Sequence, residues 1–89
     1  MMFNYSKIPE HCREGMKRYI EQGIAPGSFL TAVLSNDLVG AFGKADDINT
    51  LRMRDYCDFL YNEIPMPAWG SRLNVKTWIN SFRKSSEGE

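Results

Sequence analysis

The side chains that most often carry catalysis are few in this chain of 89 residues. His11 is the single histidine, and it directly precedes Cys12. Because neighbouring residues of a helix point about 100° apart, these two side chains are not placed to act as base and nucleophile. The other cysteine, Cys57, is far away in the sequence, whereas zinc ligands occur in clusters with short spacing. The sequence therefore indicates no Cys–His catalysis, no metal site and no cofactor.

Two pairs of carboxylates offer another kind of chemistry. Asp46 and Asp47 precede a stretch with helical spacing, where they are expected to cap the helix. Asp55 and Asp58 are expected on the solvent-facing side of the same helix. Neither spacing by itself indicates general acid–base catalysis, and the glycines do not form a phosphate-binding loop. We therefore expect a protein that is not an enzyme and that acts by binding.

Two predicted helix starts are the main candidate binding sites. The free backbone amides and partial positive charge of a helix start favour phosphate or carboxylate groups. At the second start, an indole ring offers a stacking face and a guanidinium group offers a planar fork of donors. The alternative is that the serines simply cap their helices. The candidate ligand-binding residues are Gly27 and Ser28 at the first start, and Trp69, Gly70, Ser71 and Arg72 at the second.

Asn36 and Asp37 form a secondary candidate, because they interrupt an apolar run. Buried polar side chains need hydrogen-bond partners, which either a neighbouring helix end or a ligand would supply. Asn and Asp also compete for backbone hydrogen bonds, so a kink or break near Asn36 is compatible with the sequence. Both a structural role and a ligand-binding role remain open for this pair.

These candidates are positioned by four predicted helices. The expected ranges are about Pro9 to Gln22, from after Gly27 to about Gly43, Asp46 or Asp47 to Ile64, and Ser71 to about Lys84. Gly23 is expected to end the first helix, and residues 65–70 are expected to form an ordered loop or short turn. No stretch alternates apolar and polar residues as a strand does. The sequence predicts an all-α fold, a compact bundle of about four helices in one domain of residues 1–84, with a flexible polar tail at 85–89.

The apolar residues that recur at helical spacing predict the core. Both cysteines occupy such positions, so each is expected to be a buried free thiol that packs as a small apolar side chain. The predicted inward-facing residues are Ile8, Cys12, Met16, Tyr19, Ile20, Leu30, Val33, Leu34, Leu38, Ala41, Leu51, Met53, Tyr56, Cys57, Leu60, Ile64, Leu73, Val75, Trp78, Ile79 and Phe82.

The net charge is zero, with 25% charged residues. A protein that coats nucleic acid normally carries a basic excess, so the four basic residues between Arg72 and Lys84 are expected to form a solvated face. The chain has neither a signal-peptide pattern nor an apolar run near the roughly 20 residues that span a bilayer. A cytoplasmic protein with reduced thiols is therefore expected.

Four segments stand out together: Ile8–Glu10, Arg18–Leu38, Tyr61–Pro65 and Trp69–Ser71. Their most specific part reads R-Y-I-E-x-G-I-x-P-G-S-F-L-x-A-V-L-x-N-D-L. With these segments the chain resembles a group of short helical proteins encoded by phages and prophages, over roughly residues 8–80. The resemblance brings no established activity. It implies an accessory protein made during infection, in the cytoplasm of the host cell.

Small phage proteins of this kind often antagonise host defence, in one of two ways. The resemblance implies a protein that sequesters a nucleotide-type signalling ligand as an oligomer, or one that covers a host defence protein. A small regulatory or structural adaptor is a further alternative. The two candidate anion sites and the surplus of apolar residues favour sequestration, so that function is the first expectation.

The aromatic content predicts a homo-oligomer, at least a dimer. Five Phe, four Tyr and two Trp exceed what so small a core readily encloses, and large exposed apolar patches are uncommon on monomers. Light scattering at micromolar concentration should therefore give a mass above the 10.2 kDa of one chain. A monomeric mass would refute this prediction and weaken the case for sequestration by an oligomer.

Overall fold

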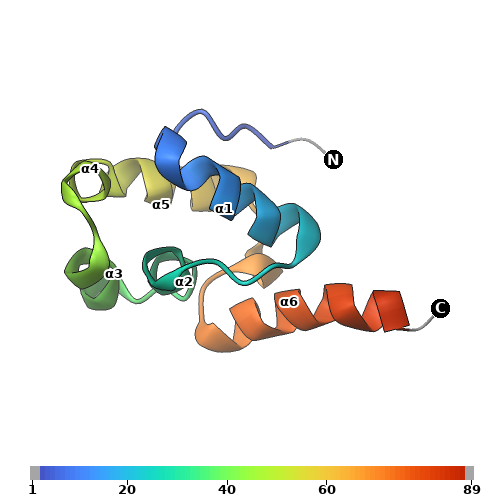
Figure 1. Ribbon diagram of the computed structural model, residues 1–89. Coiled ribbons are helices and arrows are strands. Elements are labelled where there is room, and N and C mark those ends of the chain that lie inside the picture. The colour runs from blue at the N-terminus through green and yellow to red at the C-terminus, as the bar shows by residue number, and fades with distance from the viewer. Residues whose placement is uncertain (1–2, 88–89) are drawn as a thin grey trace.

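The computed structural model describes residues 3–87, in which six α-helices and one short 3-10 helix account for the regular structure (Figure 1). The described residues contain no strand, so the predicted all-α class is confirmed. The expected number of about four helices is wrong, because two of the predicted helices are each divided in two. The elements are α1 (Glu10–Gln22), α2 (Ser28–Leu34), α3 (Leu38–Lys44), α4 (Asp47–Leu51), α5 (Met53–Glu63), η1 (Met66–Ala68) and α6 (Arg72–Glu87).

The first division lies at Asn36, whose backbone takes the left-handed conformation with φ of 63°. Asp37 then begins a new helix, because its Oδ1 accepts the N–H of Gly40 at 3.0 Å. This is the break that the Asn–Asp pair allowed. The second division, at Arg52, was not expected. The N–H of Arg52 is shared between the carbonyls of Ile48 and Asn49, at 3.1 and 3.2 Å, which tightens the turn and ends α4.

The main core lies between α1, α2, α5 and the start of α6. Ile8, Met16 and Tyr19 are fully buried there. Two bonds of Tyr19 fix the neighbouring segments: its hydroxyl donates to the carbonyl of Ala68 at 2.6 Å, and its carbonyl accepts the indole N–H of Trp78 at 3.2 Å. Helix α1 is thereby attached to both η1 and α6.

Gly23 ends α1 as predicted. It takes a left-handed conformation with φ of 69°, and its N–H bonds to the carbonyl of Tyr19 at 3.0 Å. A Cβ atom at this position would lie 2.5 Å from the ring of Phe82. Glycine is therefore needed twice here, for the backbone conformation and for the close packing of α1 against α6.

Several residues predicted to be buried are exposed, namely Leu38, Leu51, Cys57 and Leu73. The breaks at Asn36 and Arg52 reset the direction in which each helix presents its side chains, so the predicted faces do not continue to Leu38 and Leu51. Cys57 lies within the unbroken helix α5, and it is exposed because it lines an open pocket. Leu73 fails for a different reason: it precedes the buried Val75 by two positions, about 200° around the helix. Cys12 is half-buried, and both cysteines are free.

Helix α6 continues to Glu87, past the expected end near Lys84. Residues 88 and 89 of the predicted tail lie outside the described residues. Within residues 3–87, none of the helices combines the length and the apolar character that crossing a membrane requires.

Asn49, only 3% exposed, joins three helices through its side chain. Its Oδ1 accepts the hydroxyl of Tyr56 at 2.7 Å, and its Nδ2 lies 3.5 Å from the thiol of Cys12. Asp46 caps α4 by accepting the N–H of Asn49 at 2.7 Å, and it also hydrogen-bonds the exposed His11 at 2.9 Å. Burial raises the pKa of Tyr56, which keeps the hydroxyl protonated as a donor.

Replacing Asn49 should destabilise the fold more than its size suggests. Asn49→Ala leaves the buried hydroxyl of Tyr56 without its acceptor, and an unsatisfied buried group costs about 1–3 kcal/mol. The change is measured by urea denaturation. Adding Tyr56→Phe should recover part of the loss, because it removes the stranded hydroxyl. The exposed Cys57 provides a control, since Cys57→Ala should stay within about 0.5 kcal/mol. An Asn49→Ala effect no larger than this control would contradict the network.

Candidate functional site

The predicted site at residues 69–72 is largely occupied by structural bonds. Ser71 caps α6, because its Oγ accepts the N–H of Asn74 at 3.0 Å. The N–H of Gly70 donates to the carbonyl of Leu34 at 2.7 Å. Trp69 donates its indole N–H to the carbonyl of Ile64 at 3.3 Å and packs against the main core. The capping role that the sequence left open for Ser71 is thus present, and these groups hold the start of α6 against the end of α2.

Arg72 remains exposed at the edge of this segment. Its guanidinium pairs with the carboxylate of Asp37 at 3.1 Å, with 66% of its side chain accessible. The sequence treated Arg72 and Asp37 as parts of separate candidate sites, and the structure brings them into contact. An exposed pair of this kind contributes little to stability, so the guanidinium is available to another anion at small cost.

The other predicted site, Gly27-Ser28, lies at the start of α2, a helix of only seven residues. Both residues are exposed, and no side chain caps this end. They face a shallow depression of about 410 Å³, which Arg18, Lys44 and Asp46 also line. The two predicted helix starts therefore do not combine into one site.

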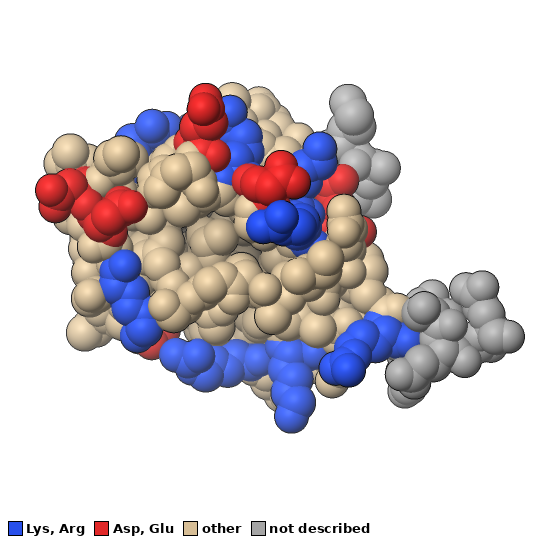
Figure 2. Space-filling model, in the orientation of Figure 1, with Lys and Arg blue, Asp and Glu red and all other residues tan. Residues whose placement is uncertain are grey.

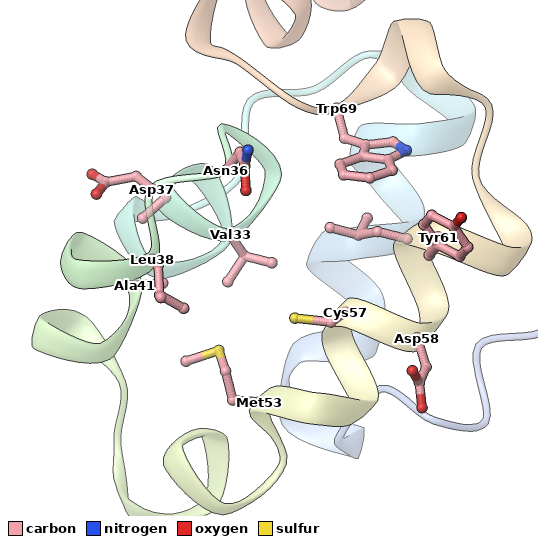
Figure 3. Close-up of a pocket in the computed structure, with 12 residues that line it drawn as sticks. Val33, Asn36, Asp37, Leu38, Ala41, Met53, Cys57, Asp58, Tyr61 and Trp69 are labelled. Atoms are coloured by element: carbon pink, nitrogen blue, oxygen red, sulfur yellow. The ribbon is translucent and has the colours of Figure 1, made fainter.

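Trp69 instead meets Asn36 and Asp37 at an apolar pocket of about 300 Å³ (Figure 3). We call it the α3–α5 pocket, because α2 and α3 form one side and α5 the other. In the close-up, Trp69 and Met53 lie at opposite ends of it. The remaining lining is mostly apolar and consists of Ala32, Val33, Leu38, Ala41, Cys57, Asp58, Leu60 and Tyr61.

The charges at the α3–α5 pocket are unsuited to a phosphate. Its lining contains two carboxylates, Asp37 and Asp58, but neither lysine nor arginine. Asp37 is bound to Arg72, and Asp58 lies 3.5 Å from Lys7 and 3.7 Å from Arg54. The carboxylates are thus compensated from outside the pocket, while its interior offers apolar contact.

Two residues that line this pocket, Leu38 and Tyr61, are exposed to solvent, and further exposed apolar residues lie on α3. Val39 is 83% exposed, and Tyr61, which lines the pocket, is 80% exposed. Leu38 and Phe42 of α3 are also exposed. Sequence periodicity missed this surface, because it placed Leu38 inside a continuous helix. The signal that could have found it was the Asn36-Asp37 break itself, which turns α3 away from the direction of α2.

A second groove of about 380 Å³ lies between α6 and the segment from Ala25 to Ser35. Arg72, Lys76 and Arg83 line it, and Figure 2 shows Lys and Arg side chains in a row along α6. We call it the basic groove. The sequence assigned these residues to a solvated face. The sequence feature that could have predicted the basic groove is the spacing of these residues by four and seven positions. This spacing places all three within about 40° on one side of a helix.

No metal centre is formed by the described residues, where His, Cys, Asp and Glu side chains do not gather in groups of three suited to hold an ion. Comparison of the chain with family models, with curated proteins and with solved structures finds no match.

The two thiols should differ in reactivity. Cys57 is exposed at the α3–α5 pocket, whereas Cys12 is half-buried beside Asn49. Brief treatment with iodoacetamide followed by mass spectrometry should modify Cys57 first, because the reagent reaches an exposed sulfur more readily than a half-buried one. Equal rates at both positions, or faster reaction at Cys12, would contradict this arrangement.

Proposed function

We propose that the protein is a non-catalytic binding protein that covers a partner protein, and that the α3–α5 pocket receives apolar side chains of that partner. The observation that carries the proposal is an open apolar pocket whose lining includes the exposed side chains of Leu38 and Tyr61, with further exposed apolar residues on α3. The pocket itself is at the small end of the range for small-molecule sites. A small ligand would leave Val39 and Phe42 in water, whereas a protein surface would cover them.

The shape of the pocket suits an amphipathic helix. Helices α2 and α3 form one side and α5 the other, as in other grooves that bind a helix through apolar anchors one turn apart. Trp69 and Met53 at its ends are favourable contact residues, since tryptophan supplies a large rigid surface and methionine adapts to its partner. The two carboxylates at the pocket favour a partner helix with neutral or basic flanks over an acidic one.

The biological setting of the proposal follows from the resemblance to phage and prophage proteins. It makes the partner a host defence protein and the place of action the cytoplasm of the host cell. A regulatory or structural adaptor would use the same surface with a phage-encoded partner, so the identity of the bound protein separates the two. A second copy of this chain is a third possible partner at the α3–α5 pocket, and light scattering would detect the resulting oligomer.

Sequestration of a nucleotide-type ligand is a second candidate function, and a different observation favours it. The α3–α5 pocket lacks a cationic side chain, but the basic groove has three. The two functions therefore depend on separate surfaces and can be tested separately.

Substitution of one exposed leucine should abolish partner binding without unfolding the protein. Leu38 is 61% exposed at the pocket and is the first residue of α3. Leu38→Asp places a charge against the apolar partner, while an acidic residue is tolerated in the first turn of a helix. A partner retained on the tagged wild-type protein from infected cells, at fixed stoichiometry, should be lost with this variant.

Leu73→Asp is the matched control. Leu73 is 71% exposed and lies in the first turn of α6, away from the α3–α5 pocket. It should bind the partner as the wild type does, and both variants should keep their thermal midpoints. Equal loss with both variants, or full retention with Leu38→Asp, would show that the pocket is not the binding surface.

A further inference from the structure

We infer that the basic groove binds the phosphate of a small molecule that also carries a flat apolar ring, a ligand of mononucleotide type. The groove is formed by α6 on one side and by the end of α2 with the segment before it on the other. It is separate from the α3–α5 pocket, so this inference does not depend on the proposed binding of a partner protein.

The basic groove concentrates positive charge. Arg72, Lys76 and Arg83 line the groove together. From Arg72 to Arg83, α6 contains no acidic residue. Asp37 neutralises Arg72 in part, whereas Lys76 and Arg83 form no ion pair within the described part of the chain. Three cations spaced along about three turns of α6 create a local field for an anion in a protein with zero net charge.

Ser35 supplies the second, independent argument. It lines the basic groove at the end of α2 and is only 8% exposed. Its Oγ is buried and has no hydrogen-bond partner among the described residues. A buried hydroxyl normally has a partner, because leaving it unsatisfied is unfavourable. The hydroxyl is closed off from solvent as the side chain stands. A phosphate oxygen held by the neighbouring cations would provide the partner once the Ser35 side chain turns toward the groove.

The uncharged lining defines the rest of the ligand. Val75 is buried, and Ile79 and Pro26 are half-buried, so they offer an apolar surface beside the charges. Asn80 adds an exposed amide that can both donate and accept a hydrogen bond. Inorganic phosphate would use only the cations and Ser35. A nucleoside monophosphate would use the apolar surface and the amide as well.

The size of the groove favours a small ligand over a nucleic acid. Its volume of about 380 Å³ lies within the range of small-molecule sites. Binding to a nucleic acid backbone increases with the number of phosphates neutralised, and three cations in one groove give only a short track. The ligand we infer is therefore a single phosphorylated molecule.

The test uses the full-length protein, adenosine 5′-monophosphate and inorganic phosphate, with titration calorimetry at low salt. AMP should bind and should bind more tightly than phosphate. Lys76→Ala and Arg83→Ala should each weaken AMP binding by about tenfold or more, as expected for loss of a hydrogen bond to a charged group. Lys17→Ala, an exposed lysine of α1 outside the groove, should leave the affinity unchanged.

Ser35→Ala separates a ligand-binding role from a structural one. Because the hydroxyl of Ser35 lacks a partner, its removal should leave the thermal midpoint unchanged or slightly raised, while AMP binding weakens. A lowered midpoint with unchanged AMP affinity would make Ser35 purely structural and overturn its part in the site.

Three results would overturn the inference as a whole. The first is the absence of AMP and phosphate binding at millimolar concentration. The second is equal weakening by Lys17→Ala and Lys76→Ala, which would mean diffuse charge. The third is tighter binding of a single-stranded oligonucleotide per phosphate than of AMP. Leu38→Asp should not change AMP binding, so failure here and failure of the partner-protein proposal are distinguishable.

Discussion

The left-handed backbone of Asn36 is the constraint on which both candidate surfaces depend. It ends α2 at Leu34 and allows Asp37 to cap a new helix that runs in another direction. The carbonyl of Leu34, which an uninterrupted helix would have used internally, instead accepts the N–H of Gly70. That bond places the start of α6 beside the break. One local feature of the backbone therefore separates α3 from α2 and brings the basic helix against them.

The residues around this break divide between the two surfaces. Asn36 and Asp37 line the α3–α5 pocket, and Ser35 lines the basic groove. The Asp37–Arg72 pair joins them, with one partner in each lining. Because this pair is exposed and screened by solvent, it stabilises the fold only weakly. A phosphate that competes for Arg72 therefore meets little resistance from the structure.

The sequence predicted the helical class and the core of the unbroken helix α1, because periodicity is reliable where a helix continues without a break. Met16, Tyr19 and Ile20 are buried as expected. The same method was wrong for Leu38 and Leu51, because each lies beside a break between two helices. Periodicity was counted across each break as if one helix continued, so the predicted side of the helix was not the buried one. The candidate site was predicted in part. Arg72 does line a groove, and helical spacing alone could have placed Arg83 on the same side of α6. Ser35 is distant in sequence, and only the packing of α6 against α2 brings it to that groove.

The exposed apolar residues of α3 are the strongest sign that stability alone did not shape this surface. Burying a large aliphatic side chain contributes about 1.5–3 kcal/mol to the stability of the folded state. A domain this small buries few such side chains, so each one left exposed is a substantial loss. Leu38 and Val39 nevertheless lie in water beside a pocket that is itself apolar. Scattered exposed leucines are ordinary, but Leu38 lines this opening together with the exposed Tyr61, and Val39 is the next residue of α3. A sequence selected for an isolated monomer would gain solubility by placing polar residues there at no loss of core packing. Their presence is most simply explained by a partner that covers them.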